Sequence, residues 1–427
     1  MRIAIVGSGI SGLVTAYLLS QDHDITVFEA ADYIGGHTHT LEVDEQGRKT
    51  PVDTGFIVFN DWTYPNFCRL LDRLGVASQP SDMSFSVTSR RTGLEYQGSS
   101  VSGLFAQRAN LLRPSHYRFL AGLLRFNRAA KRLARRNGAN GHGTDACRNA
   151  AAPITLREFA AASRIHRDVL ENYVLPMGSS IWSADPERFM DFPAEYMAEF
   201  YENHGMLNLF HCPQWRVVQG GSHEYVKSIT RSFRERIRLR CPVAAVTRSP
   251  EGVLLRTATG SDERFDAVVL ACHSDQALAL LADPTPQERE ILGAIPYHAN
   301  ATVLHTDTRL LPTRRRAWAS WNYLIPAQPR GAVTMTYNMN MLQSLATSNT
   351  YCVSLNAPET ICDEAVIERM TYHHPVYSPA GVAAQKRHDE INGRHRTWFC
   401  GAYWGYGFHE DGVNSALAVC RHFGKSL

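Results

Sequence analysis

The sequence lacks the features that would place it among secreted, disulfide-bonded or membrane-spanning proteins. Its nine cysteines are scattered singly with no C-x-x-C pair, so we expect reduced thiols in a cytoplasmic compartment. No apolar run approaches the roughly 18 residues that a transmembrane helix needs. The run that starts at Ile3 is interrupted at Gly7, which is too early for a signal peptide. We therefore expect a cytoplasmic protein, at most peripheral on the inner face of a membrane.

Several catalytic and binding motifs are also missing. The chain has no G-x-S-x-G elbow, and its 18 histidines show no zinc-ligand spacing with cysteine or carboxylate. We therefore expect no metal ion. The net charge is only +3 and nothing resembles a nucleic-acid-binding module, so we do not expect a nucleic-acid partner either.

What the sequence does contain is enough apolar material for two domains. It has 427 residues, of which 44% are apolar and 20% are charged, as in ordinary globular proteins. A chain of this length exceeds what a single hydrophobic core usually organises. We therefore expect a globular protein with at least two domains.

The first thirty residues predict a dinucleotide-binding unit. Residues 3–6 form a short apolar run, typical of a parallel strand that is buried on both faces. Gly7, Gly9 and Gly12 follow as G-x-G-x-x-G, which permits a tight turn, close approach of a pyrophosphate and close packing of helix on strand. A second strand ends in Glu29, where the fingerprint places a carboxylate for the ribose hydroxyls. An adenine dinucleotide, NAD or FAD, is expected here; a strand–turn–helix without a ligand is the alternative.

The loop after Glu29 indicates which dinucleotide binds. It contains Gly35 and Gly36, and here the sequence resembles the FAD-binding amine oxidase superfamily, whose members carry Glu-x(5)-Gly-Gly and usually an arginine next. This chain has His37 in place of the arginine, so the resemblance implies that histidine supplies part of the pyrophosphate contact. The resemblance also implies that Ser11 and Ala30, beside these motifs, contact FAD.

Residues 400–413, CGAYWGYGFHEDGV, combine four glycines with four aromatic residues directly before an expected helix at 414–423. In the superfamily such a segment feeds a helix that points its N-terminus at the flavin ring, where the helix dipole stabilises negative charge on the reduced ring. The residues that the resemblance assigns to the flavin are Gly401, Ala402, Gly412 and Val413. Trp404 and Tyr406 are expected to line the substrate pocket. An aromatic core loop before a surface helix is the alternative.

The middle of the chain supplies a third expected contact. Residues 239–260 predict two strands joined by a hairpin, and the resemblance implies that the backbone of Val243 contacts the adenine. The whole chain is thus expected to be α/β, with a glutathione-reductase-like, Rossmann-type FAD-binding domain and an inserted mixed α+β substrate domain. The expected segments are 1–80, 219–290 and 395–427 for the FAD-binding domain, and 81–218 and 291–394 for the substrate domain.

The G-x-G-x-x-G occurs once, so flavoenzymes that need a second domain for NAD(P)H are disfavoured. Within the superfamily the sequence is most similar to a bacterial group of predicted NAD/FAD-binding oxidoreductases. The matching phrases are ANATVLHTD (299–307), AWASWNY (317–323) and GYGFHEDG (405–412). Genes of that group often neighbour cyclopropane-fatty-acid-synthase-like methyltransferases, which implies a lipid acyl substrate.

The resemblance also guides the expected chemistry. Amine oxidases of the superfamily usually carry a lysine in the stretch that corresponds here to NATVLHTD, which has none, and this counts against simple amine oxidation. We predict FAD-dependent oxidation or desaturation of an apolar substrate, in which a hydride leaves a carbon for flavin N5 while a base accepts a proton. His409 and Glu410 are the candidate bases, with structural roles as the alternative, and Trp321 and Tyr323 are candidate pocket residues. Neither Cys400 nor His409 matches the family's covalent attachment motif, so non-covalent FAD is expected.

Three other functions stay open. The first is a flavin amine oxidase. The second is a flavin-dependent fatty acid double-bond isomerase, which would turn over without net electron transfer. The third is a non-catalytic FAD-binding partner of a lipid methyltransferase.

Residues 115–136, SHYRFLAGLLRFNRAAKRLARR, form a second distinctive stretch. On a helical projection its apolar face carries Phe119, Leu123, Phe126, Ala130 and Leu133. The other face carries seven basic residues and no acidic one: Arg118, Arg125, Arg128, Lys131, Arg132, Arg135 and Arg136. Such a helix can lie on an anionic membrane surface. The alternative is a substrate-domain helix that packs by its apolar face and leaves its basic back in solvent.

Overall fold

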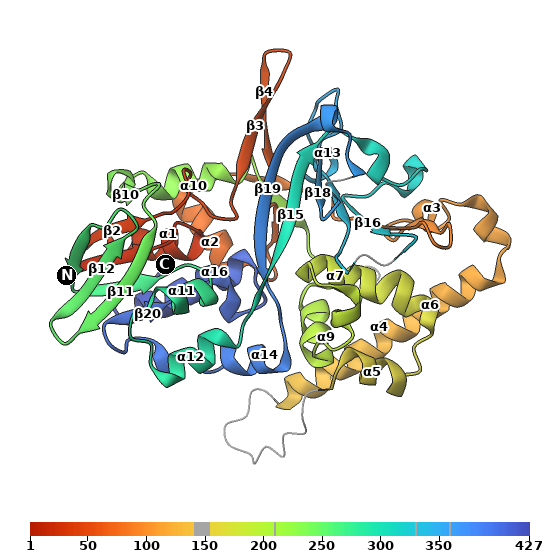
Figure 1. Ribbon diagram of the computed structural model, residues 1–427. Coiled ribbons are helices and arrows are strands. Elements are labelled where there is room, and N and C mark those ends of the chain that lie inside the picture. The colour runs from red at the N-terminus through yellow and green to blue at the C-terminus, as the bar shows by residue number, and fades with distance from the viewer. Residues whose placement is uncertain (141–153, 209–210, 329–330, 358–359) are drawn as a thin grey trace. The chain divides into compact units, whose positions relative to one another are not determined.

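The computed structural model describes residues 1–140, 154–208, 211–328, 331–357 and 360–427. They form two compact units, each assembled from separate stretches of the chain (Figure 1). Unit 1 comprises Met1–Pro80, Arg216–His298 and Pro375–Leu427, and unit 2 comprises Ser81–Trp215 and Ala299–His374.

Unit 1 is built around a sheet of five parallel strands in the order β10-β2-β1-β14-β20. The strands are β1 (Arg2–Val6), β2 (Asp24–Phe28), β10 (Ile237–Arg238), β14 (Ala267–Leu270) and β20 (Thr397–Phe399). Strand β1 is buried from Ile3 to Val6 and β14 along its whole length, as expected for parallel strands covered on both faces. The predicted Rossmann-type sheet is confirmed, and the carboxyl ends of all five strands lie along one edge.

The helices of unit 1 are α1 (Ile10–Leu19), α2 (Pro65–Leu74), α10 (His223–Thr230), α11 (Ser274–Leu280), α12 (Pro286–Gly293), α14 (Pro379–Gln385), α15 (His388–Ile391) and α16 (His409–Arg421). Helices α1, α2, α10 and α16 pack together on one face of the parallel sheet, and a small antiparallel sheet with helices α11 and α12 covers the other. Helix α1 packs against α16 and α10, and α2 packs against the same two helices. Across the sheet, Ala4 and Val6 of β1 join one core cluster with residues of α11, α12 and the sheet β11-β12-β13.

The remaining strands of unit 1 are short. They are β3 (Thr40–Glu45), β4 (Arg48–Asp53), β5 (Val58–Asn60), β6 (Ser78–Pro80), β9 (Trp215–Val218), β11 (Val243–Ser249), β12 (Gly252–Thr257) and β13 (Asp262–Phe265). Strands β3 and β4 form a hairpin, and β5, β9 and β6 form a three-stranded sheet. Strands β11 and β12 are the hairpin that residues 239–260 predict.

The limits of unit 1 differ from the predicted domain limits. Residues 291–298 and 375–394, assigned to the substrate domain from sequence, lie in unit 1, as do residues 216–218. Helices α14 and α15 pack against α12, and Ala384 and Ile391 join the same core cluster as β1. This packing brings together segments about a hundred residues apart, so no local change of composition marks the boundary.

Unit 2 contains a mixed sheet of seven strands in the order β19-β15-β18-β17-β16-β7-β8. The strands are β7 (Phe85–Ser89), β8 (Glu95–Gln97), β15 (Tyr297–His305), β16 (Trp321–Ile325), β17 (Met335–Asn338), β18 (Cys352–Leu355) and β19 (Val366–Pro375). Strands β7 and β16 pair in parallel, whereas β16, β17 and β18 are antiparallel neighbours. The predicted mixed α+β character of the second domain is confirmed.

Most helices of unit 2 lie between β8 and β9 in the chain. They are α3 (Val101–Leu104), α4 (Pro114–Asn140), α5 (Leu156–Ala162), α6 (Arg167–Val169), α7 (Leu175–Trp182), α8 (Pro186–Phe189) and α9 (Ala194–Asn203), with α13 (Met339–Leu342) after β17. Short helices η1 (Arg108–Leu112), η2 (Leu170–Val174) and η5 (Arg315–Ala317) accompany them. No helix among the described residues has both the length and the hydropathy required to cross a membrane.

Helix α4 corresponds to the basic stretch that the sequence predicts at 115–136. Its apolar face is turned inward: Phe119, Phe126 and Ala130 are buried, and the helix packs against α9 and α6. Leu123 and Leu133 are half-buried. The apolar face therefore belongs to the core of unit 2, as in the packed alternative, and only the basic face is exposed; the side chain of Arg136 lies outside the described residues.

Candidate FAD site

The parallel strands of unit 1 bring four segments to one edge of the sheet. Gly7 follows β1, Glu29 follows β2, Ala271 follows β14, and Cys400 with Gly401 follows β20. In open parallel sheets the region outside the carboxyl ends of the strands is where ligands bind. The segments predicted to bind a dinucleotide are therefore gathered where the fold can use them together.

The glycines of the first turn meet the steric demands predicted for them. Gly7 has a φ of +105°, and a Cβ there would lie 2.7 Å from the carbonyl oxygen of Ala271. A Cβ on Gly12 would lie 2.0 Å from the carbonyl oxygen of Gly7, so only glycine lets α1 start this close to β1. Gly9, in contrast, caps α1 and has no described atom within 4 Å of its Cβ position. The open space beside Gly9 fits a ligand that approaches the N-terminus of α1.

Glu29 is tied to this turn by hydrogen bonds. Its carboxylate accepts from the backbone N–H of Ser8 at 2.9 Å, from the Ser8 hydroxyl at 2.5 Å and from the N–H of Ala31 at 2.9 Å. The carboxylate is thus fixed beside the glycine turn at the end of β2, where the fingerprint needs it. Ser8 was not singled out in the sequence; its place between Gly7 and Gly9 is the one local feature that could have found it.

The Gly35–Gly36 loop lies against the same turn. Gly35 forms an isolated parallel bridge with Gly9, its N–H donates to the Ser8 hydroxyl at 3.3 Å, and a Cβ on Gly36 would lie 3.1 Å from the Cα of Gly9. His37 follows, half-buried, with its ring centroid 6.1 Å from that of His273 at the start of α11. An imidazole therefore stands next to the dinucleotide turn, where most relatives are expected to have arginine.

The predicted adenine contact lies beside Glu29. The backbone N–H of Cys241 donates to the carbonyl of Glu29 at 2.8 Å, and that of Arg240 donates to the carbonyl of Ala31 at 2.9 Å. Val243, two residues on, is half-buried at the start of β11, and Ala30 is exposed. These bonds connect the middle segment of the chain to the end of β2.

The N-terminal turn of α16 packs directly on the N-terminal turn of α1. A Cβ on Gly412 would lie 2.6 Å from Cγ2 of Ile10, 3.1 Å from the Ser11 hydroxyl oxygen and 3.9 Å from Cβ of Ala402. Val413 is fully buried, and the N–H of Gly401 donates to the Ser415 hydroxyl at 2.9 Å. Two positive helix ends therefore meet at one place, a favourable arrangement for a pyrophosphate and for an anionic ring.

The buried imidazole of His409 contacts two neighbouring hydroxyl groups. Its Nε2 lies 3.0 Å from the Thr38 hydroxyl and 3.0 Å from the Tyr225 hydroxyl, and its ring stacks on Phe56. Burial, with a smaller effect of His37, holds its pKa well below the usual value. These contacts favour the structural role that the sequence left open as the alternative, and the role of His409 as a general base stays a prediction.

Glu410 caps a neighbouring helix. Its two carboxylate oxygens accept from the backbone N–H groups of Asn66 at 3.0 Å and Phe67 at 2.8 Å, in the first turn of α2. Tyr64, which precedes α2, provides no side-chain cap of its own. Burial raises the pKa of Glu410, while these N–H donors favour its charged form. The capping contacts favour the structural alternative for Glu410 as well, and its role as a base stays a prediction.

The acidic group that the sequence did not single out is Asp411. It occupies the third position of α16, where its carboxylate accepts from the N–H of Phe408 at 2.9 Å. Burial raises its pKa to about 7. A Cβ on Gly405 would lie 2.1 Å from its Oδ1, so a glycine is needed to make room for this carboxyl. The spacing of an acid three residues into the helix was the available clue.

Cys400 is an unsuitable attachment point for a flavin. Its thiol is fully buried and lies 3.8 Å from the Thr15 hydroxyl of α1, and burial raises its pKa.

The described residues contain no group of three or more His, Cys, Asp or Glu side chains placed to hold a metal ion.

The predicted pocket aromatics fall in different surroundings. Trp404 is half-buried against the core cluster of unit 1, with its ring 5.0 Å from Tyr403 and 4.5 Å from His388, and Tyr406 is half-buried before α16. These contacts of Trp404 are those of core packing, so its pocket role stays a prediction. Trp321 and Tyr323 lie on one face of β16 in unit 2, and the ring of Trp321 is edge-on to Tyr337 at 5.0 Å.

The residues at the sheet edge fit an adenine dinucleotide. The fit rests on the open space beside Gly9, the two helix N-termini that meet at Gly412, and the carboxylate of Glu29 at the end of β2. When FAD is bound, Gly7, Gly9 and Gly12 would hold the pyrophosphate, Glu29 the ribose, and the turn at Gly412 the flavin.

Comparisons with known proteins agree with this geometry. The family model described as flavin-containing amine oxidoreductase matches residues 10–329. A search of curated proteins finds no match. Among solved structures, a CLA-producing fatty acid isomerase from P. acnes is similar, with 17% identity, a TM-score of 0.68, and 99% of this chain and 98% of that chain covered. Cyclohexylamine oxidase from Brevibacterium oxydans IH-35A has 19% identity, a TM-score of 0.67 and 99% coverage of both chains. A mutant of putrescine oxidase has 15% identity, a TM-score of 0.72 and coverage of 99% and 98%. At these identities the likeness to the three structures shows the fold alone.

Proposed function

The chain belongs to the family of flavin-containing amine oxidoreductases and is an FAD-dependent oxidoreductase, and we propose that it oxidises or desaturates a fatty acyl chain of a membrane lipid. FAD, when bound, accepts a hydride from a substrate carbon. Transfer of that hydride to FAD, with transfer of a proton from the adjacent carbon to water, would leave a C=C bond in the acyl chain. Oxygen or a quinone then takes up the two electrons.

One face of the sheet in unit 2 supports an apolar substrate. Cross-strand pairing places Trp321 of β16 opposite Phe85 and Tyr337, and Tyr323 opposite Val87 and Met335. The same face continues with Tyr96, Val353 and Leu355. The opposite face carries polar residues such as Asn322 and Ser354. A face that holds aromatic and aliphatic side chains without a charge suits an acyl chain and offers no counterion to a protonated amine.

Two unpartnered indole groups carry the proposal furthest. Nε1 of Trp321 and Nε1 of Trp182 are buried, and neither has a hydrogen-bond partner among the described residues. They lie on β16 and α7, which pack against each other. An indole N–H can only donate, and a protonated amine also only donates. A carbonyl or carboxylate oxygen of an acyl group would accept from these donors, whereas an ammonium group would leave them unpaired.

The absence of a lysine from β15 agrees with this proposal. The resemblance implies that amine oxidases carry a lysine in the corresponding strand. Strand β15 reads YHANATVLH and has no lysine at any of its nine positions. An acyl oxidoreductase has no need of the group that simple amine oxidation is expected to use.

The direct test is an anaerobic titration of the holoprotein. Bleaching of the flavin absorption is expected with phospholipids that carry methylated or unsaturated acyl chains and not with a panel of amines. The product should weigh two hydrogens less than the substrate in mass spectrometry of the released acyl chains. Bleaching by amines alone would overturn the proposal, and a shifted double bond without bleaching would replace it with isomerisation.

Two tryptophan variants test whether the N–H group of Trp321 contributes to binding of the lipid substrate. Trp321→Phe keeps an aromatic ring and removes the donor, so KM for the lipid should rise about tenfold, the value of one buried hydrogen bond of roughly 1–1.5 kcal/mol. Trp398→Phe is the matched control, because the buried Nε1 of Trp398 in β20 of unit 1 also lacks a partner among the described residues. Equal effects of the two variants would remove the assigned role of Trp321.

A further inference from the structure

Exposed apolar side chains are concentrated in one short part of unit 2. Eight large apolar side chains of the described residues are exposed, and five of them fall between residues 101 and 124. These five are Val101, Leu111, Leu112, Tyr117 and Leu124. Leu112 is 89% exposed and Val101 75%. Exposed apolar side chains that gather in one place, unlike scattered ones, mark an interaction surface.

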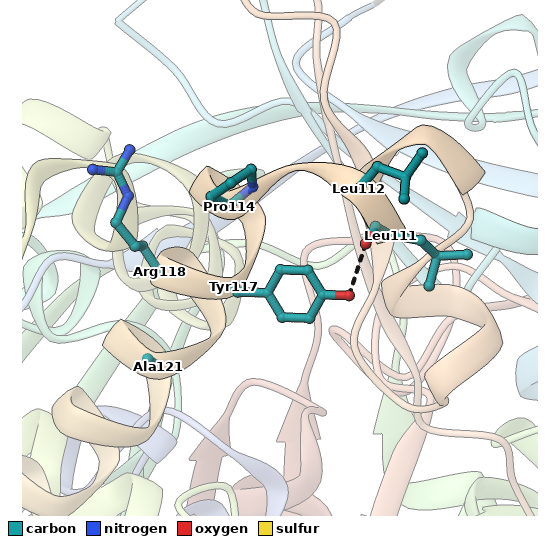
Figure 2. A pocket seen from close by; sticks show the side chains of 6 residues that line it. All are labelled: Leu111, Leu112, Pro114, Tyr117, Arg118 and Ala121. Atoms are coloured by element: carbon teal, nitrogen blue, oxygen red, sulfur yellow. Dashed lines mark hydrogen bonds between the residues drawn. The ribbon is translucent and has the colours of Figure 1, made fainter.

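Several of these side chains form a shallow apolar groove where η1 passes into α4. The groove is lined by Leu111, Leu112, Pro114, Tyr117, Arg118 and Ala121. Figure 2 shows Leu111, Leu112 and Tyr117 side by side, with the Tyr117 hydroxyl donating to the carbonyl of Leu111 at 2.9 Å. This bond fixes the leucines at the start of α4. We call this surface, Leu111 to Ala121, the η1–α4 corner.

The stretch of sequence that contains the η1–α4 corner carries charge of a single sign. Between Gln97 and Asp145 the sequence has nine basic residues and no acidic one. On the exposed face of α4 these are Arg118, Arg125, Arg128, Arg132 and Arg135. Within the described residues no carboxylate forms an ion pair with any of these five arginines. Their positive charge is therefore available to an external anionic surface.

A neighbouring element adds to the same charge. Helix η5 packs against α3, the helix that carries Val101. Arg315 and Arg316 of η5 are exposed, and the Arg315 guanidinium lies 4.9 Å from the ring centroid of Trp318. Basic groups thus accompany the exposed apolar side chains on both α3 and α4.

We propose that the η1–α4 corner docks the protein on an anionic phospholipid bilayer. The exposed side chains of Leu111, Leu112 and Tyr117 enter the boundary between headgroups and acyl chains, and the arginines of α4 contact lipid phosphates. The apolar face of α4 cannot make this contact, because it is packed in unit 2. Exposed leucines amid basic residues match an interface that is apolar inside and anionic outside, and a nucleic acid would offer the leucines nothing.

This docking goes beyond the proposed function, because it requires no turnover and does not depend on which substrate is oxidised. The two are tested separately. Binding is measured on vesicles without electron transfer, and flavin reduction is measured with acyl substrate dispersed in micelles.

The test is co-sedimentation of the holoprotein with vesicles. Binding is expected to vesicles of equal parts phosphatidylglycerol and phosphatidylcholine, to be weak on phosphatidylcholine alone, and to fall as salt is raised. The double variant Leu111→Ser/Leu112→Ser should lose at least about tenfold in affinity, because it removes two side chains that bury apolar surface on docking. The triple variant Arg118→Gln/Arg128→Gln/Arg132→Gln should lose about hundredfold, at about fivefold per basic residue near the surface.

Matched controls come from the same unit. Ile367→Ser removes an exposed aliphatic side chain on β19, and Arg188→Gln removes an exposed arginine on α8. Both should bind as the wild type does. Equal binding of the wild type to neutral and anionic vesicles, or no binding to either, would overturn the proposal. So would a wild-type dimer that the leucine variant dissociates, since the corner would then join two copies of the chain.

Discussion

The imidazole of His409 lies flat on the phenyl ring of Phe56, with 3.4 Å between the ring centroids and 14° between the planes. Its Nε2 lies at equal distances of 3.0 Å from the hydroxyls of Thr38 and Tyr225. The start of α16 is thereby anchored to the segment that follows the Gly35–Gly36 loop. Two parts of the FAD site, about 370 residues apart in sequence, are held together by one neutral side chain.

His409→Ala should therefore act on stability. The free energy of unfolding is expected to fall by about 2–4 kcal/mol, because the variant opens a cavity on Phe56 and leaves two buried hydroxyls with one partner fewer. Urea unfolding followed by tryptophan fluorescence measures this change. Tyr225→Phe, which removes only one hydroxyl, should cost about 1 kcal/mol. Wild-type stability combined with a large loss of flavin reduction would instead make His409 the base.

Glu410→Gln separates a capping role from a catalytic one. The neutral amide accepts with one oxygen where the carboxylate accepts with two, so one N–H of the first turn of α2 loses its partner. The expected loss is about 1–2 kcal/mol of stability, with flavin reduction kept within a few-fold of the wild type. Stopped-flow reduction and urea unfolding of the same preparation give both values. A drop in rate of several orders of magnitude at unchanged stability would show that the carboxylate takes the substrate proton.

Gly9→Ala and Gly12→Ala should fail in different ways. The methyl group of Gly9→Ala meets no described atom within 4 Å, so the apoprotein should keep its stability while FAD affinity falls about tenfold or more, which is ~1.4 kcal/mol. The methyl group of Gly12→Ala meets the Gly7 carbonyl at 2.0 Å, so the apoprotein itself should lose at least about 1–3 kcal/mol. Titration of apoprotein with FAD, together with thermal unfolding without FAD, distinguishes the two. Unchanged FAD affinity in the Gly9 variant would contradict the assigned site.

Asp411 should make stability depend on pH. Burial raises its pKa to about 7, from an ordinary value of about 3.9 for an aspartate. Between these two values the folded protein holds a proton that the unfolded chain has released, so the stabilising contribution is complete below about pH 4 and is lost as the pH rises to about 7. Relative to Asp411→Asn, the wild type should lose up to about 1.4 kcal/mol per pH unit across this range.

Urea unfolding at about pH 5, 6 and 7 measures the difference. Asp389→Asn is the control, because the side chain of Asp389 is 99% exposed and should not alter the profile. Parallel profiles of the wild type and Asp411→Asn would show that the carboxyl of Asp411 is already charged in the folded protein.

The dinucleotide unit could be predicted because its determinants are local. Ile3 to Val6, the glycines at 7, 9 and 12 and Glu29 fall within one strand–turn–helix–strand segment, where steric limits on a turn act between near neighbours. The gathering of Val243 and Gly401 at the same edge followed only through the family resemblance. The sequence near each of these two residues does not indicate that strands far apart in the chain become adjacent.

The same limit explains which contacts at the site sequence reasoning missed. Glu410 and Asn66 are 344 residues apart, and a helix cap supplied from another helix leaves no pattern around either residue. Helix α4 is an example in which a clear local pattern leaves the packing partner undetermined. The spacing of its apolar residues predicts an amphipathic helix. Whether the apolar face contacts a membrane or helices α9 and α6 depends on long-range packing.

The sequence by itself determined the Rossmann-type turn, the position of the ribose carboxylate and the single-sign charge of residues 98–144, because each depends on residue type at short spacing. Only the tertiary structure showed the contacts that favour structural roles for His409 and Glu410, the membership of α14 and α15 in unit 1, and the exposed apolar surface of the η1–α4 corner. These outcomes depend on which distant segments bury apolar surface against one another. The free energy gained by that burial depends on all the contacts of the packed unit.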